Sequence, residues 1–474
     1  MREDRTTTHS GNESNGKSSL STATHRDRVF LVGVELTDHD KLAEGDGPHW
    51  SIDDSISELR QLATTAGGEV IGSATQRLRS PNPRYYLGSG KVAELHELKI
   101  QHNIDLFVFD DDLSPSQHNN LERELSARVI DRHGLILTIF AQRARTHEGR
   151  LQVELAQYEY MLPRLTGQWS HLERQRGGID VRGGPGETQL EVDRRQIRNR
   201  ISDLKRELSG VRQHRAHARA RRARAGMPVV ALVGYTNAGK STVMNALSRA
   251  RLDAEDKLFA TLDPTTRRVR LPSAHEILLS DTVGFIQKLP SELVAAFRAT
   301  LEELESADVL VHIVDVSHPA GIDQAGIVKQ TLAELGLADR PVVTALNKID
   351  RFAESIDSSG RPIFEPDVAG QLDEIRQAFP NAVLVSATRG WGLTEMLEQV
   401  DQVLRDEMLD VTVRLPYSEG KLAALFRLRG SVDQESYGAS AIVIRGKIPV
   451  ALEPMFQPYA EERQGTRRGR GRRR

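Results

Sequence analysis

The sequence has no cysteine and no long apolar run, and its charges nearly cancel. The absence of cysteine excludes disulfide bonds and thiolate metal ligands, and it fits a cytosolic protein. No apolar stretch approaches the ~18 residues of a membrane span. The polar first residues contain no apolar core, which excludes a secretory signal. We therefore expect a cytoplasmic protein without a membrane span. The formal net charge of −2 says nothing about partners.

Two basic runs stand out from this near-neutral background. "VRQHRAHARARRARAG" occupies residues 211–226, and "RRGRGRRR" occupies residues 467–474. Segregated basic runs predict two electrostatic contact patches for nucleic acid. A solvated helix face and a solubilising tail would produce the same pattern, so both interpretations stay open.

The first half of the chain has the pattern of an α/β domain. "RVFLVGVEL" and "IDLFVFD" are strand patterns with a helical pattern between them. Such alternation indicates a parallel sheet. We predict a disordered leader at 1–27 and an N-terminal α/β domain at 28–148. The "GSGK" within "YYLGSGKVAEL" lacks the spacing of a phosphate-binding loop, so we expect a structural turn there.

A helical hairpin is predicted at 149–225. Apolar residues repeat at steps of three and four before a break and every seven residues after it, which is typical of two helices packed antiparallel. The break, "RGGIDVRGGPGETQLEVDRR", is too rich in glycine to lie inside a helix. A glycine-rich tip with Arg174, Arg176 and Arg182 suits a narrow polyanionic site, which makes these arginines RNA-contact candidates. A flexible connector is the alternative.

A phosphate-binding loop is predicted where the next strand ends. The segment fits G-x-x-x-x-G-K-[ST], follows a strand pattern and begins a helical one, which is the context that supports the motif. Backbone N–H groups would bind phosphate oxygens, the lysine would reach the β- and γ-phosphates, and the serine would bind Mg²⁺. The loop residues are Gly234, Tyr235, Thr236, Asn237, Ala238, Gly239, Lys240 and Ser241.

Three further motifs follow in the order of a GTPase domain. Asp281 stands at a strand end, where it would hold Mg²⁺ through water, and the Gly284 N–H would contact the γ-phosphate. Asp350 would accept hydrogen bonds from guanine N1–H and N2–H₂; adenine lacks this donor pair, so the motif favours GTP. The predicted nucleotide-binding residues in these motifs are Asp281, Thr282, Val283, Gly284, Asn347, Lys348, Ile349, Asp350, Ser386, Ala387 and Thr388.

These motifs predict a GTPase domain at 227–404 with a mostly parallel sheet. A small α+β domain is expected at 405–458, and a basic disordered tail at 459–474. The fold class is therefore an α/β multidomain protein that also contains the helical hairpin.

The catalytic group is not identified by the motifs. Phe285 follows Gly284, at the position where Ras-like enzymes carry the glutamine that orients the attacking water. We therefore expect slow basal hydrolysis and stimulation by a partner. Asn237 is a candidate for placing K⁺ beside the phosphates, as a second cation besides Mg²⁺. For the switch threonine that closes over Mg²⁺, spacing does not choose among Thr261, Thr265 and Thr266.

The chain resembles the HflX family of ribosome-associated GTPases. The resemblance rests on "GGIDVRGGPGETQLEVDRR", "YYLGSGKVAEL", "GYTNAGKST", "LFATLDPTTR", "DTVGFIQKLP" and "NKID". It implies binding to the large ribosomal subunit, with the hairpin tip near the peptidyl-transferase centre. The family pattern selects Thr261 as the second Mg²⁺ residue beside Ser241. It also adds five residues to the nucleotide site: Phe259, Ala260, Thr261, Leu262 and Asp263.

The resulting hypothesis is a monomeric GTPase that binds GTP or GDP, the large ribosomal subunit and the RNA of that subunit. It would split or rescue stalled ribosomes under stress. The alternative is a GTP-dependent RNA-binding regulator or ribosome assembly factor without splitting activity.

Overall fold

The computed structural model describes residues 26–37, 51–166, 189–224, 227–248, 258–259, 261–262, 265–288, 304–356, 362–364 and 375–461. Outside these ranges lie residues 1–25 and 462–474, the RNA-contact candidates Arg174, Arg176 and Arg182, and the predicted site residues Ala260 and Asp263. None of the helices in the described ranges is long and apolar enough to cross a bilayer.

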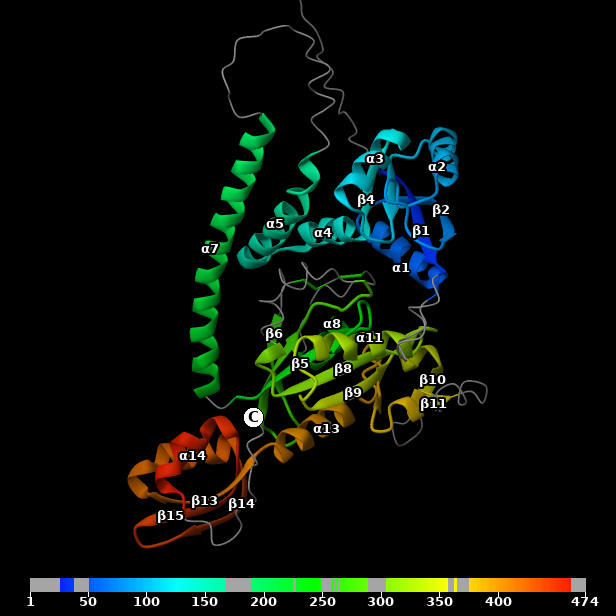
Figure 1. The fold of residues 1–474 in the computed structure, drawn as a ribbon. Coiled ribbons are helices and arrows are strands. Elements are labelled where there is room, and N and C mark those ends of the chain that lie inside the picture. The colour runs from blue at the N-terminus through cyan, green and yellow to red at the C-terminus, as the bar shows by residue number, and fades with distance from the viewer. Residues whose placement is uncertain are drawn as a thin grey trace, which may run out of the picture.

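The N-terminal domain is a four-stranded parallel sheet with helices on both faces (Figure 1). Side chains alternate along the first strand, so Leu31 packs with Leu59 and Ile136 while Phe30 packs with Val92 on the opposite face. The strand order is β2-β1-β3-β4. The strands are β1 (Arg28–Leu36), β2 (Glu69–Leu78), β3 (Leu106–Phe109) and β4 (Arg128–Asp131), and the helices are α1 (Ile52–Thr65), α2 (Ser89–His102), α3 (Pro115–Leu125) and α4 (Arg132–Arg143).

The "GSGK" segment begins helix α2. Gly88 is its N-cap residue, and the backbone N–H groups of Lys91 and Val92 donate to the Gly88 carbonyl. The segment thus has the local structural role of a helix start.

Two long helices form an arm beside the sheet domains. α5 (His147–Met161), followed by the short η2 (Arg164–Thr166), lies antiparallel to α7 (Gln189–Arg224) (Figure 1). The seam contains Leu151 and Leu155 from α5 and Leu204 and Leu208 from α7, all buried. Because these leucines repeat at helical spacing on both elements, the apolar stripes meet and hold the helices together.

The domain predicted at 227–404, named the P-loop domain after its phosphate-binding loop, is built on a six-stranded sheet. Its order is β12-β9-β8-β5-β7-β6, and every neighbouring pair is parallel except β6 and β7. The strands are β5 (Val229–Gly234), β6 (Thr265–Arg270), β7 (Glu276–Asp281), β8 (Val309–Asp315), β9 (Val342–Asn347) and β12 (Val383–Leu384). The other elements are α8 (Lys240–Ser248), α11 (Gly321–Glu334), η3 (Ile349–Arg351), the hairpin β10 (Ala353–Ile356) and β11 (Pro362–Phe364), and α13 (Leu393–Asp406).

The C-terminal domain is a three-stranded antiparallel sheet covered by one helix. Its order is β13-β15-β14, and Phe426 and Phe456 pack edge to face in its core with ring centroids 5.4 Å apart. The elements are β13 (Leu409–Pro416), η4 (Tyr417–Glu419), α14 (Gly420–Arg429), β14 (Ser431–Tyr437), β15 (Ala441–Ile448), η5 (Val450–Leu452), α15 (Glu453–Phe456) and η6 (Gln457–Tyr459). The predicted α/β multidomain class is confirmed.

The N-terminal and P-loop domains share one apolar core. Phe140 of α4 packs edge to face against Phe259 of the P-loop domain, with ring centroids 4.6 Å apart. The same cluster includes Leu59 of α1 and Phe285, which follows the β7 end. The segments that contain Phe259 and Phe285 border the predicted nucleotide site, and both therefore touch the N-terminal domain.

Candidate functional site

The functional residues lie at the carboxyl edge of the parallel strands in the P-loop domain. β5 ends at Gly234, β7 at Asp281, β8 at Asp315 and β9 at Asn347, so four strands deliver their following residues to one edge. In open α/β sheets this edge is where ligands bind. Motifs that are far apart in the sequence therefore lie close together in space.

The loop after β5 requires glycine at both ends. Gly234 has φ +154° and Gly239 has φ +99°. A Cβ built on Gly239 would lie 2.2 Å from Asn347 Nδ2, and one on Gly234 would lie 2.4 Å from the Ile313 carbonyl oxygen. A side chain at either position would push the loop away from the neighbouring strands, so the loop closes tightly before α8 begins.

Lys240 is buried at the start of α8, and within the described residues its hydrogen-bond partners are carbonyl oxygens. Its Nζ donates to the Gly234 oxygen at 3.0 Å and to the Tyr235 oxygen at 2.7 Å. Burial lowers the pKa of Lys240 to about 8. A buried ammonium held by neutral carbonyls is short of negative charge, which an anionic ligand would supply.

A serine, a threonine and an aspartate meet beside this lysine. Ser241 Oγ donates to Asp281 Oδ2 at 2.6 Å and lies 2.7 Å from Thr261 Oγ1, which donates to the same carboxylate oxygen at 2.9 Å. Asp281 is fully buried, its other oxygen has no described partner, and burial raises its pKa. Two hydroxyls and a carboxylate are hard oxygen ligands of the kind that Mg²⁺ prefers.

The structure also distinguishes the three candidate threonines. Thr261 is the one that reaches Ser241, whereas Thr265 and Thr266 lie in β6 and pair with Asp281 and Ser280 of β7. Phe259, two residues before Thr261, has φ +54° and is buried against α4.

Asn347 ties the base-side motifs to the phosphate-binding loop. Its Nδ2 donates to the Ala238 oxygen at 2.8 Å, and its Oδ1 accepts from the Ala387 N–H at 3.1 Å. Asp350 Oδ1 accepts from Ser386 Oγ at 2.6 Å. These bonds position one carboxylate next to a backbone turn, an arrangement that can read the edge of a purine.

The Lys348 side chain extends from the motif after β9 toward the end of β8. Its Nζ lies 2.7 Å from an Asp315 oxygen. Ile349 is fully buried beneath it, while Thr388 Oγ1 lies 3.1 Å from Ser386 Oγ.

The residues after β7 pack directly on the phosphate-binding loop. A Cβ built on Gly284 would lie 2.7 Å from Thr236 Cα and 3.0 Å from Lys240 Nζ. Phe285 is buried, its N–H donates to the Gly234 oxygen at 3.1 Å, and its oxygen accepts from the Thr236 N–H at 2.7 Å. The Phe285 side chain belongs to the core and cannot orient a water molecule.

Sequence reasoning missed a polar cluster between the two domains. Arg132 of the N-terminal domain donates to Glu58 at 2.6 Å, to Asp110 at 2.8 Å and to the Gln287 oxygen at 3.1 Å. Lys288 Nζ donates to Asp110 at 2.6 Å. Burial alone would raise the pKa of Asp110, but Arg132 and Lys288 outweigh it and lower that pKa to about 2. The cluster ties the segment after β7 to the N-terminal sheet.

Tyr235 joins this cluster to the phosphate-binding loop. Its hydroxyl donates to Glu58 and accepts from the Gln287 N–H at 2.8 Å. The Tyr235 side chain therefore points toward the N-terminal domain, and only its backbone belongs to the loop that was predicted to bind phosphate. Glu58 lies 177 residues away in the sequence, and no local pattern signals this pairing.

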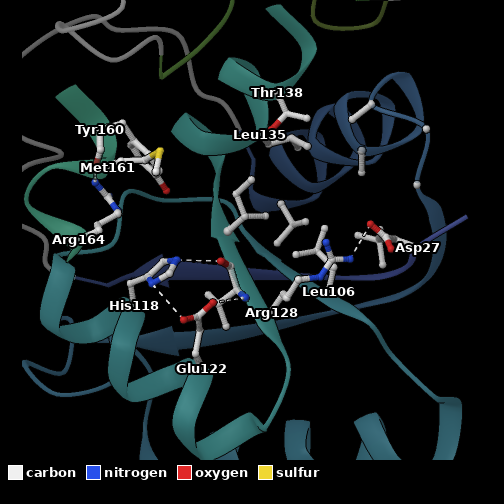
Figure 2. A pocket seen from close by; sticks show the side chains of 18 of the residues that line it. Asp27, Leu106, His118, Glu122, Arg128, Leu135, Thr138, Tyr160, Met161 and Arg164 are labelled. Carbon is white, nitrogen blue, oxygen red and sulfur yellow. Dashed lines mark hydrogen bonds and ion pairs between the residues drawn. The ribbon is translucent and has the colours of Figure 1, made fainter. Parts of the chain in front are cut away.

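A cavity of about 680 Å³ lies between the N-terminal sheet and the residues of α5 and η2 (Figure 2). Two pairs lie within its lining: Asp27 lies 2.6 Å from Arg128, and His118 lies 3.8 Å from Glu122. Arg164, which also lines it, pairs with Asp131 at 2.9 Å. His118 Nε2 also lies 2.8 Å from the Val129 oxygen. None of the residues predicted from the motifs lines this cavity, so the sheet edge of the P-loop domain is the candidate site.

The fold and the site define a P-loop GTPase, an enzyme that hydrolyses GTP. Family models match three consecutive stretches: a GTP-binding GTPase N-terminal region over 53–141, a GTP-binding GTPase middle region over 143–222, and a 50S ribosome-binding GTPase domain over 229–348. The chain is 43% identical to GTPase HflX of Caldanaerobacter subterraneus over 437 residues, which cover 92% of this chain and 94% of that protein.

GTPase HflX of Escherichia coli is also 43% identical, over 81% of this chain and 86% of that protein. Among solved structures, a GTP-binding protein from Sulfolobus solfataricus in complex with GDP aligns with a TM-score of 0.40 and 22% identity, over 79% of this chain and 98% of that one. On the evidence of its sequence relatives, the chain belongs to the HflX family of GTPases, as its motifs predicted.

Proposed function

We propose that this chain binds GTP at the carboxyl edge of the β5–β9 region and hydrolyses it there. The supporting observation is the meeting of Ser241, Thr261 and Asp281 beside the buried Lys240. Backbone N–H groups of the loop and the start of α8 would bind phosphate oxygens. Lys240 Nζ would then exchange its two carbonyl partners for the β- and γ-phosphates.

Guanine would be recognised by Asp350. One of its carboxylate oxygens accepts from Ser386, and the carboxylate retains acceptor capacity for guanine N1–H and N2–H₂. The backbone of residues 386–388 would face guanine O6. Adenine presents no matching donor pair, so its binding would leave the carboxylate unpaired and costly.

The donor set fits Mg²⁺. Ser241 and Thr261 would hold the ion directly, and Asp281 would hold it through water, since its unpartnered oxygen is buried beside them. When bound, the ion supplies positive charge that neutralises the phosphate oxygens during transfer. The two hydroxyls keep their orientation because both already donate toward Asp281.

Hydrolysis is expected to be slow without a partner. Phe285 is part of the core, so it supplies no polar atom for the attacking water. Asn237, with φ +62° in the loop, is the proposed contact for K⁺ beside the phosphates. The test compares GTPase rates in KCl and NaCl at equal ionic strength; equal rates would contradict the K⁺ proposal.

The proposed partner is the large ribosomal subunit, bound through the helical arm and the arginines at 174, 176 and 182. The match to a family model described as a 50S ribosome-binding GTPase supports this. On this proposal the protein acts in the cytoplasm and splits or rescues stalled ribosomes under stress. A GTP-dependent assembly factor or RNA-binding regulator would use the same contacts without separating subunits.

Two measurements test the ribosomal proposal. The GTPase rate is measured with and without purified large subunits, and stimulation is expected; an unchanged rate contradicts the proposal. Sucrose gradients then compare 70S-type monosomes after incubation with a non-hydrolysable GTP analogue or with GDP. Loss of monosomes with the analogue supports splitting, whereas intact monosomes with bound protein favour the assembly-factor alternative.

A further inference from the structure

A cavity of about 590 Å³ lies between the N-terminal domain and the phosphate-binding loop. On one side it is lined by Thr236 and Asn237 of the loop and by Lys348 of the base-side motif. On the opposite side it is lined by helix α1, through Arg60 and Gln61. The cavity therefore borders the phosphate-binding loop of the proposed GTP site and has a wall from a different domain.

Helix α1 is held in place against the loop by hydrogen bonds. Its N-cap Ser51 accepts from the Asp54 N–H at 3.1 Å, and Ser55 on its buried face donates to Asp110 at 2.6 Å. Glu58 accepts from Tyr235, the residue immediately before Thr236. Arg60 and Gln61, two and three residues further along α1, line the cavity that borders this loop.

Two cations in the cavity lining form no ion pair within the described ranges: Arg60, and Arg351, whose guanidinium donates one hydrogen bond to Ser317 Oγ at 3.2 Å. The carboxylate of Glu58 is neutralised by Arg132, and that of Asp315 is neutralised by Lys348 at 2.7 Å. The side chain of Arg60 is exposed, and no residue in the described ranges forms a hydrogen bond or ion pair with its guanidinium. A free guanidinium in a cavity whose other wall is a phosphate-binding loop is suited to a phosphate oxygen.

We propose that Arg60 donates hydrogen bonds to the phosphates of the bound guanine nucleotide, so that α1 completes the nucleotide site from the N-terminal domain. The proposal rests on the proposed GTP site. It answers a need of that site, because Lys240 is the only cation within the loop itself and Phe285 leaves the position after Gly284 without a polar side chain. Charge that develops on the phosphates would be stabilised by a second cation.

The experiment uses the full-length chain with Arg60→Ala, Arg60→Lys and the matched control Arg123→Ala. Arg123 is an exposed arginine of the same domain, on α3, and does not line the cavity. GTP and GDP affinities are measured with fluorescent nucleotides, kcat is measured without ribosomes, and Tm is measured without nucleotide. Arg60→Ala is expected to weaken GTP affinity or lower kcat by about tenfold or more. Arg60→Lys should recover part of the loss because it keeps the charge.

The outcomes separate this inference from the GTP site itself. If the unaltered chain binds and hydrolyses GTP while Arg60→Ala behaves like Arg123→Ala, the role of Arg60 is overturned and the site stands. If the unaltered chain binds no GTP, both fail together. A loss in Arg60→Ala that accompanies a lower Tm and is not recovered by Arg60→Lys also overturns the proposal, because it would reflect folding.

Discussion

Lys240 shows how a single residue can favour ligand binding while it lowers the stability of the nucleotide-free protein. The ammonium is buried and donates to two carbonyl oxygens, and no carboxylate in the described structure accepts a hydrogen bond from it. Its pKa, lowered by burial to about 8, reflects the cost of that charge. Burial of the Lys240 ammonium therefore costs free energy in the nucleotide-free protein, and a bound anion would offset that cost.

Replacing Lys240 with Met tests whether this residue favours nucleotide binding and destabilises the nucleotide-free protein. Lys240→Met removes the charge but keeps a similar length, so we expect GTP affinity to fall by about 100-fold or more. The Tm of the nucleotide-free chain should stay the same or rise, because no ammonium is then buried. Fluorescent-nucleotide titration and thermal unfolding measure the two effects. A marked fall in the nucleotide-free Tm would show that the lysine stabilises the empty fold.

His312 gives the stability a pH dependence. It is buried on β8, and its Nε2 has no described partner. Burial, and secondly the charge of Lys240, lower the pKa of His312 from 6.5 to about 4. The native protein therefore binds fewer protons than the unfolded chain between these values, so its stability falls as the pH drops from about 6.5 to 4.

The expected loss from this group is about 3 kcal/mol in the free energy of unfolding. Urea unfolding at several pH values should show a smaller loss in His312→Gln than in the unaltered chain. Variant His102→Gln, at an exposed histidine of α2, is the control and should keep the full pH dependence. Parallel curves for His312→Gln and the unaltered chain would contradict the prediction.

At the scale of elements, the helical arm depends on a narrow apolar seam. Where the side chains of the arm are described, its core consists of the facing leucines and their neighbours Tyr158 and Ile201. Ion pairs such as Lys205 with Glu159, at 2.8 Å, flank this core on the surface. Exposed ion pairs contribute little to stability. The seam, and not the charges beside it, should decide whether α5 and α7 stay together.

Leu204→Ala tests the seam. Leu204 is fully buried, so its truncation should destabilise the arm by about 2–5 kcal/mol. Hydrogen exchange should then become faster in α5 and α7 while the sheets keep their protection. Leu428→Ala, at a leucine that is 60% exposed on α14, is the control and should change neither. Unchanged exchange in Leu204→Ala would show that the arm is held by other contacts.

At the scale of the whole molecule, a buried ionic cluster joins two domains. Arg132 is 1% exposed and serves Glu58 and Asp110 within its own domain and the Gln287 oxygen in the other. Because the apolar core is also shared, from Leu59 to Phe285, we expect the two domains to unfold together. Calorimetry should show one transition for them.

Arg132→Met should break this coupling. It leaves two buried carboxylates without their main partner, which costs about 3–5 kcal/mol. The matched control is Arg128→Met, since Arg128 forms an exposed pair with Asp27 whose loss costs about 1 kcal/mol or less. Urea unfolding gives both values, and calorimetry shows whether the single transition splits. Equal effects of the two substitutions would contradict a special role for Arg132.

Features written in short stretches of sequence were predictable because local geometry suffices for them. The loop from Gly234 to Ser241 is recognisable since its glycines, lysine and helix start must be adjacent. Asp281 and Asn347 follow apolar strands, so their arrival at one sheet edge could be expected. Strand β14 was not anticipated, because its "SVDQESY" is mostly polar and lies at the edge of a sheet.

The sequence by itself was enough to predict the chemistry proposed for this protein: a phosphate-binding loop, a guanine-reading carboxylate and the lack of a glutamine after Gly284. Spacing left three threonines open and the family pattern pointed to Thr261, whose contact with Ser241 the tertiary structure then showed. Only the tertiary structure decided that Tyr235 bonds to Glu58. The physical reason is that a hydrogen bond depends on distance in space. Chain folding brings Tyr235 and Glu58, which are 177 positions apart, within hydrogen-bond distance. No periodicity or spacing in the sequence predicts that contact.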